Sequence, residues 1–319
     1  MGHFFLVLYQ IGIFVMLLSL GVLCRKIRIL NEVSLYSISQ LVVKVALPAF
    51  IFVNTASSTS REVLLGALPI LLAALCLYAV LILLSTVLEK AFRLKGNRRN
   101  VFRMCLMFGN GGLIGVPLAV GIYPENALVY FGLITVIDMV MIWTYGVALS
   151  YDVESKGAQG YRLTIRKFLR MMINPALISV LLSIVFILFG LKLPGIVNTV
   201  LEKTGNLLSP LGMIYMGAML SWKSVKASLR RTEIYAEILL KMLVVPLLFF
   251  FVMLKIGLPE DMAGTFAVFA GLPTFMVSMM LAKNNGSDGD YAVGFVMMTT
   301  LACLVTYPVM SLLQSVLPC

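Results

Sequence analysis

Apolar runs of about twenty residues follow one another along almost the whole chain, separated by short polar loops. A run of that length crosses the hydrocarbon core of a bilayer as an α-helix. Of the 319 residues, 61% are hydrophobic and 12% are charged, whereas a soluble domain carries about 25% charged residues. The sequence therefore predicts an all-α integral membrane protein.

The apolar runs predict ten transmembrane helices. Their approximate bounds are 4–23, 33–54, 63–88, 101–122, 126–150, 174–192, 196–221, 233–256, 260–282 and 291–316. Lys and Arg concentrate in alternate loops, which is typical of the cytoplasmic side of a membrane protein. We therefore expect a multi-pass protein of the plasma membrane with both termini outside the cytoplasm. Because the same loops account for the net charge of +11, we expect the lipid bilayer and no nucleic acid as a partner.

Ten spans divide into two blocks of five, and an odd block reverses the topology of the block that follows it. This is the inverted-repeat plan of many secondary transporters. The predicted first repeat is 1–152, a basic cytoplasmic linker is 153–172, and the second repeat is 173–319. Internal similarity is faint: the stretch that starts at Phe108 can be set beside the one that starts at Phe269.

Span 4 contains an unusual concentration of helix-breaking residues. Gly109, Gly111, Gly112 and Gly115 precede Pro117. Gly costs a helix interior about 1 kcal/mol relative to Ala, and Pro about 3 kcal/mol. In hydrocarbon, irregular backbone is tolerated only where it is buried in protein or lines a watery cavity. We therefore predict two half-helices joined by an unwound segment inside the bundle. Close helix packing through small residues is the alternative reading of the glycines.

Span 9 carries Gly271 and Pro273 at a similar depth. If both spans are interrupted and cross, each second half-helix points its N-terminus, with free N–H groups and a partial positive charge, toward the membrane centre. Two such ends favour an anion, and Asn110 adds a neutral donor and acceptor. The carboxyl ends of the first half-helices would suit a cation.

Two ionisable residues lie deep within predicted spans, where a charge is a functional candidate by default. Asp138, in span 5, is either a proton or cation coupling site or a buried carboxyl bonded between helices. Lys44, in span 2, either contacts an anionic substrate or pairs with Asp138. We expect Lys203 and Lys241 to reach the interface or to pair locally.

Several motifs resemble the auxin efflux carrier family, which includes plant PIN proteins and bacterial organic-acid permeases. The matching residues are Asn110, Gly115 and Pro117 in span 4, Leu47-Pro48 in span 2, Leu211-Gly212-Met213 with Gly217 in span 7, and Leu272-Pro273 in span 9. Ser278 stands where the family commonly has a second proline. The chain lacks the large hydrophilic central loop of the long plant members and is similar to a compact prokaryotic member.

The resemblance implies a ten-helix fold in which helices 4 and 9 are broken and cross. It also implies a scaffold of spans 1, 2, 6 and 7, a transport domain of spans 3–5 and 8–10, an elevator-like motion, organic-anion cargo and a homodimer. The expected substrate-binding residues are Asn110, Gly111, Gly115, Pro117, Gly271, Pro273, Ser278 and Lys44, with Asp138 as a coupling or pocket residue.

The predicted function is a secondary transporter (permease or efflux carrier) that moves a small organic anion such as a carboxylate. We expect no enzyme, because neither a nucleophile–base pair nor a paired-aspartate arrangement is evident, and no cofactor beyond a coupling Na⁺ or H⁺. With His3 as the only histidine and scattered cysteines, no metal site is expected. The alternative is a membrane receptor or sensor that binds a small organic ligand without transporting it.

Overall fold

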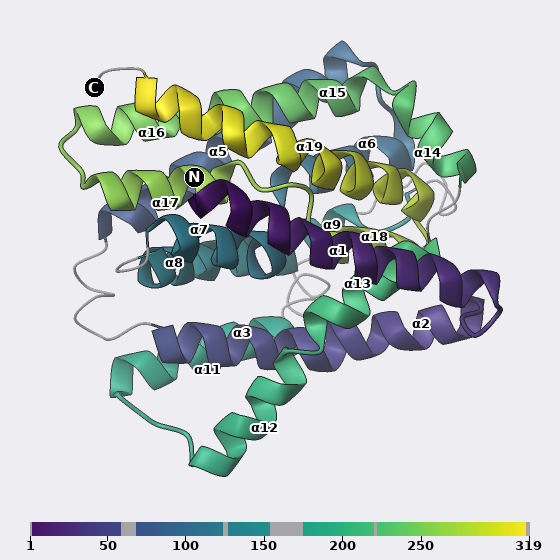
Figure 1. Cartoon of the computed structure of the whole chain (residues 1–319), viewed down its shortest axis with the longest axis horizontal. Helices are drawn as coiled ribbons and strands as arrows, with labels where there is room; N and C mark the ends of the chain where they lie inside the picture. Colours follow the sequence, from purple (N-terminus) through teal and green to yellow (C-terminus); the bar gives the residue numbers. More distant parts are fainter. Residues whose placement is uncertain (1, 59–67, 124–126, 154–174, 220–221, 317–319) are drawn as a thin grey trace.

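The computed structural model describes residues 2–58, 68–123, 127–153, 175–219 and 222–316, and every regular element within these residues is helical (Figure 1). The elements of the first half are α1 (Gly2–Lys26), α2 (Glu32–Leu41), η1 (Val42–Ala46), α3 (Leu47–Ser58), α5 (Leu68–Ala91), α6 (Gly96–Met107), η2 (Gly111–Gly115), α7 (Val116–Ile122), α8 (Ala127–Met141), η3 (Ile142–Gly146) and α9 (Val147–Leu149).

The second half begins after the linker. Its elements are α11 (Pro175–Phe189), α12 (Gly195–Gly205), α13 (Leu208–Met219), α14 (Trp222–Leu229), α15 (Thr232–Leu239), η4 (Leu240–Val244), α16 (Val245–Lys255), α17 (Glu260–Ala270), α18 (Met276–Asn284) and α19 (Gly289–Val316). The predicted linker lies almost entirely outside the described residues. The all-helical prediction is confirmed for the part of the chain that the structure describes.

Helix α5 shows how the outer surface suits lipid. Leu72, Leu75, Leu83 and Val87 on this helix are each more than half exposed, whereas Tyr78 is buried. An apolar outer face with polar groups turned inward is the arrangement that hydrocarbon requires, because polar groups need partners inside the protein. The exposed face of α5 is therefore suited to contact with lipid chains.

Four continuous helical stretches of the described chain are long and apolar enough to cross a membrane: Glu32–Val53, Pro69–Ala91, Tyr130–Leu149 and Thr232–Lys255. A fifth joins them if the two arms of α19, which meet at a 46° bend, are taken as one span. The bend lies four residues before Pro308, where the proline ring clashes with a carbonyl of the preceding turn. The count of ten spans and the inverted repeat stay predictions.

Single π-helical turns precede three of the prolines. η1 leads into Leu47-Pro48, η2 into Val116-Pro117 and η4 into Val245-Pro246. Proline offers no N–H and clashes with the carbonyl four residues earlier, so an α-helical turn cannot close there. A wider π turn accommodates the misfit without ending the helix, and such turns are frequent at functional sites.

The strongest contacts between helices fall within two sets, although α8 also packs on α3 and α11, and α1 also packs on α7 and α19. The division into a scaffold and a transport domain stays a prediction. The first helix set comprises α1, α2, η1, α3, α11, α12 and α13, in which α1 packs on α13 and α3 packs on α11 and α12. The second helix set comprises α5 to α9 and α14 to α19, in which α17 packs on α8 and α16, and α19 packs on α6, α14 and α18. In Figure 1, α3, α11 and α12 lie along the lower edge, and α15, α16 and α19 lie along the upper edge.

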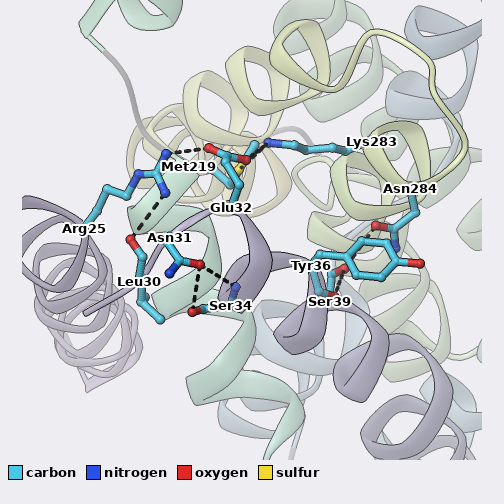
Figure 2. Close-up of polar contacts among 10 residues, drawn as sticks. All are labelled: Arg25, Leu30, Asn31, Glu32, Ser34, Tyr36, Ser39, Met219, Lys283 and Asn284. Carbon is cyan, nitrogen blue, oxygen red and sulfur yellow. Dashed lines mark hydrogen bonds and ion pairs between the residues drawn. The ribbon is translucent and has the colours of Figure 1, made fainter. Parts of the chain in front are cut away.

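Polar side chains connect the two sets where α2 meets the end of α18. Glu32 accepts from Arg25 and from Lys283, the latter over 3.1 Å, and Ser39 Oγ lies 3.1 Å from Asn284 Oδ1 (Figure 2). Arg25, Glu32 and Ser39 belong to the first helix set, whereas Lys283 and Asn284 belong to the second. These contacts hold α2 against the second set.

Candidate functional site

Two helices are interrupted where the sequence predicts breaks. α6 ends at Met107, and Phe108 has extended backbone with φ −104° and ψ 125°. Helical structure resumes at Gly111. α17 ends at Ala270 and α18 begins at Met276, so both Gly271 and Pro273 lie in the second interruption.

The first break lies earlier than the proline suggests. Pro117 lies within the helix that resumes at Gly111, directly after the π turn η2, whose wider turn accommodates the missing N–H. The non-helical residues are instead Phe108, Gly109 and Asn110. Pro117 therefore lies inside the resumed helix and does not itself form the unwound joint.

The two breaks are bonded to each other. Gly109 and Thr274 form an isolated antiparallel bridge. The Asn110 N–H donates to the Pro273 carbonyl over 2.8 Å, and the Phe275 N–H donates to the Phe108 carbonyl over 2.9 Å. Backbone groups that leave helical geometry in each segment are thus satisfied by the other, as an apolar interior demands. We call this bonded pair of segments, 108–110 and 271–275, the crossing.

Glycine is required at the crossing because the two chains approach closely. A Cβ at Gly109 would lie 2.5 Å from Leu272 Cβ, and one at Gly115 would lie 2.9 Å from Leu272 Cδ2 and overlap the ring of Phe131. Real Cβ atoms do not approach other carbons so closely. The glycines predicted as flexible elements therefore serve mainly as space for Leu272 and Phe131.

Two side chains, Asn110 in the crossing and Ser278 in the first turn of α18, are buried without a hydrogen-bond partner among the described residues. Asn110 is 1% exposed and both its side-chain polar atoms lack a partner, and the hydroxyl of Ser278, a fully buried residue, lacks one as well. A buried polar group left unpaired costs about 1–3 kcal/mol. A ligand or water that reached these groups would complete their hydrogen bonds.

The predicted site residues divide between the crossing and other places. Gly111, Gly115 and Pro117 lie on the η2–α7 side of the crossing, and Gly271, Pro273 and Ser278 lie in the second break or in the first turns of α18. Lys44 lies in η1 of the first helix set and is exposed. Of the predicted residues, Asn110, Gly271 and Pro273 therefore lie in the crossing, and Gly111, Gly115, Pro117 and Ser278 lie in the helices that adjoin it.

Asp138 has a partner that the sequence did not indicate. It is 2% exposed and accepts a hydrogen bond from the hydroxyl of Tyr78. The bond joins α8 to α5, so it corresponds to the interpretation of Asp138 as a carboxyl bonded between helices. The partner of Asp138 is therefore Tyr78 and not Lys44, which the sequence offered as one possible partner.

Lys241 does not extend to the interface, which is one of its two expected positions. It is 1% exposed, and its ammonium donates to the carbonyl of Leu272 within the second break. Glu237, which is fully buried, lies with Oε1 3.0 Å from the hydroxyl of Thr274. The signal that could have found this pair is the four-residue spacing of Glu237 and Lys241, which places two charges on one helix face.

Thr274 anchors the second break on several sides. Its N–H donates to Thr299 Oγ1 of α19 over 3.0 Å. Its hydroxyl lies 3.2 Å from the carbonyl of Cys105 and 3.0 Å from Glu237. The second break is therefore held by α6, α15 and α19 together, and the crossing has a fixed geometry.

The arrangement can bind an anion through neutral donors. The half-helices that start at Gly111 and at Met276 both begin at the crossing, and helix N-termini favour negative charge. The Asn110 amide and the Ser278 hydroxyl supply further donors. Carboxylates, which accept several hydrogen bonds, suit such a site.

Known proteins resemble the chain over nearly its whole length. A family model described as membrane transport protein matches residues 7–311. An uncharacterised transporter from Methanothermobacter thermautotrophicus is 25% identical over 303 residues, which cover 92% of this chain and 94% of that protein. An uncharacterised transporter from Methanocaldococcus jannaschii is 28% identical over 222 residues, or 67% of this chain and 69% of that protein. Both descriptions name a class of activity and no cargo.

Proposed function

The chain belongs to the membrane transport protein family, whose model covers residues 7–311, and on that premise we propose that it is a secondary transporter for a small organic anion such as a carboxylate. The family confirms the resemblance to auxin efflux carriers that the motifs indicated. Membership of this family identifies the protein as a multi-pass membrane transporter. The cargo, the motion and the orientation of the termini are our proposals.

The observation that carries the proposal is Asn110. Its side chain lies at the crossing, is 1% exposed and has no hydrogen-bond partner among the described residues. Its backbone N–H is already committed to the Pro273 carbonyl, so the residue is held in place while its amide stays available. A carboxylate that accepts from this amide, and from the N-termini of η2 and α18, would satisfy groups that are otherwise unpaired.

The proposed motion is elevator-like, with the second helix set moving against the first. Both breaks belong to the second set, so a bound anion would travel with the crossing intact. Gly212 of α13 faces the side chain of Met276, the first residue of α18, so closely that a Cβ there would overlap it. A small residue against a flexible methionine suits a surface along which two groups of helices slide. The homodimer implied by the resemblance stays a prediction.

The test is flux in proteoliposomes. We expect the reconstituted protein to accumulate one or more labelled mono- or dicarboxylates across a panel of organic acids. Asn110→Ala should lower the apparent affinity about 10- to 100-fold, because a hydrogen bond to a charged group contributes about 1.5–3 kcal/mol. Asn206→Ala, at an exposed residue that follows α12, is the matched control and should leave flux unchanged.

Two results would contradict the proposal. Folded protein that moves no acid of the panel would remove the carrier assignment. Saturable binding of an acid with no flux would instead identify the receptor or sensor that the sequence left open. Equal affinity in the Asn110→Ala and control variants would place the binding site away from the crossing.

A further inference from the structure

The largest fully buried side chain in the described part of the chain carries an unused donor. Trp143 is 0% exposed, and its indole Nε1 has no hydrogen-bond partner among the described residues. A buried tryptophan N–H usually finds a partner, and a buried donor without one is costly. A serine or threonine hydroxyl can bond to a carbonyl of its own preceding turn, whereas an indole does not. A partner for this N–H therefore has to come from outside its own helix.

Trp143 lies in a π-helical turn that no proline explains. The turn is η3, Ile142–Gly146. The π turns η1, η2 and η4 each lead into a proline, but no proline follows η3 before Pro175. Single π turns are rare in helices and are frequent at functional sites. The turn that contains Trp143 therefore has a cause other than the accommodation of a proline ring.

η3 packs against the crossing. A Cβ at Gly146 would lie 2.7 Å from Cε2 of Phe108, the first residue of the crossing. One turn before η3, Asp138 accepts from Tyr78. The ring centroid of Tyr78 lies 6.1 Å from that of Phe108. The turn with the unpaired indole thus adjoins the first break, and it belongs to a helix that is not itself broken at the crossing.

We propose that Trp143 is a further binding residue of the anion site, and that its indole N–H donates to the same carboxylate as the Asn110 amide. Both groups are neutral donors, and the two oxygens of a carboxylate accept several hydrogen bonds. A carboxylate that reaches both groups offsets the cost of two unpaired buried donors. The inference rests on the proposed function and adds to the site a residue from the helix that follows the first break.

The test replaces the N–H of the indole and leaves its shape. Benzothienylalanine is a tryptophan analogue with sulfur in place of the N–H, and a tryptophan-auxotrophic host incorporates it at tryptophan codons. The chain contains two tryptophans. Trp222→Phe, at the first residue of α14, therefore leaves Trp143 as the position that takes up the analogue. The Trp222→Phe protein with ordinary tryptophan is the matched control.

Binding of acetate, benzoate, succinate and citrate is measured by thermal shift, since a ligand of the folded state raises the melting temperature. We expect the analogue to lower the affinity for the acid that the control binds about 10- to 100-fold, because a hydrogen bond to a charged group is lost. Without acid, the analogue protein should melt at the temperature of the control or higher, because it no longer buries an unpaired donor. A structural N–H, bonded within the protein, would give a lower melting temperature and an unchanged affinity.

A second measurement needs no change at Trp143. In the Trp222→Phe protein every tryptophan signal comes from Trp143, and the ultraviolet resonance Raman band of the indole N–H reports whether this group is hydrogen-bonded. Saturation with the bound acid should shift the band from its unbonded to its bonded position. This result determines the role of Trp143 if the analogue protein does not fold.

Two outcomes overturn the inference and leave the proposed function intact. One is equal affinity of the analogue protein and the control for an acid that both bind. The other is an indole band that does not change at saturation, whether it lies at the bonded or at the unbonded position. If wild type neither binds nor transports any acid, the proposed function fails and the inference fails with it.

Discussion

At the scale of single residues, the buried carboxyl of Asp138 shows how much one hydroxyl can matter. Tyr78 is its hydrogen-bond donor, and both residues are at most 2% exposed. Tyr78→Phe keeps the ring and removes the donor. We expect it to lower the free energy of unfolding by about 1–3 kcal/mol, the cost of leaving a buried acceptor without its donor. Chemical denaturation in mild detergent is the measurement.

Tyr307→Phe is the comparison for Tyr78→Phe. The Tyr307 hydroxyl is also buried, but it donates to a neutral backbone carbonyl, that of Val268, over 3.2 Å. A neutral hydrogen bond contributes about 0.5–1.5 kcal/mol, so Tyr307→Phe should be the milder change. Equal losses in both variants would mean that Asp138 gains no more from Tyr78 than a carbonyl would.

The site residues that could be predicted are those that interrupt the regular apolar pattern of a helix. Asn110 could be found because it lies within a run of glycines, and Asp138 because it interrupts an apolar span. The sequence suggests that Lys241 reaches the interface, because it does not reveal that the carbonyl of Leu272 lies beside the Lys241 ammonium in the fold. Tyr78 was not predicted, since a tyrosine in a span is ordinary until its neighbour is a carboxylate.

At the scale of elements, Gly109 controls how closely the two broken helices approach. An added Cβ would lie 2.5 Å from Leu272 Cβ, and overpacking of this kind costs about 1–3 kcal/mol. Gly109→Ala should therefore lower the melting temperature and reduce flux at least tenfold. Gly109→Ala/Leu272→Ala removes the obstructing side chain and should recover part of both. Thermal unfolding and proteoliposome flux are measured on the same preparations.

Gly195→Ala is the control for Gly109→Ala, since a Cβ at Gly195 meets nothing within 4 Å. It should leave stability and flux within error of wild type. A double variant no better than Gly109→Ala would show that the glycine serves backbone conformation and not the space for Leu272.

Both interruptions could be predicted from the sequence, whereas their bonding to each other could not. Glycine and proline are local signals, so their effect on a helix can be inferred from their neighbours alone. The bridge between Gly109 and Thr274 joins segments from opposite halves of the chain. The position of the first break also depended on this pairing, because the bonds to Pro273 and Phe275 unwind 108–110 and leave Pro117 inside a helix.

At the scale of the whole molecule, the ion pair between Glu32 and Lys283 connects the two helix sets that we propose to move. Glu32 lies 3.1 Å from Lys283 and also accepts from Arg25, and its side chain is 62% exposed (Figure 2). An exposed pair contributes about 0.2–1 kcal/mol. If the contact exists in one transport state only, its loss should change the ratio of states about 1.5- to 5-fold, since 1.4 kcal/mol corresponds to tenfold.

Glu32→Gln is therefore expected to shift, and not to abolish, the equilibrium between states. A distance distribution between one spin label on α12 and another on α16 would measure the separation of the two helix sets. The population with the separation seen in wild type should be smaller in Glu32→Gln. Raising the salt concentration should shift wild type in the same direction, because salt screens exposed charges.

Glu202→Gln makes the same charge change at an exposed residue of α12 and should have no effect. An identical distribution in Glu32→Gln and wild type would mean that these ion pairs do not distinguish the states, and that packing between the sets, such as that of Gly212 against Met276, determines where the second set rests.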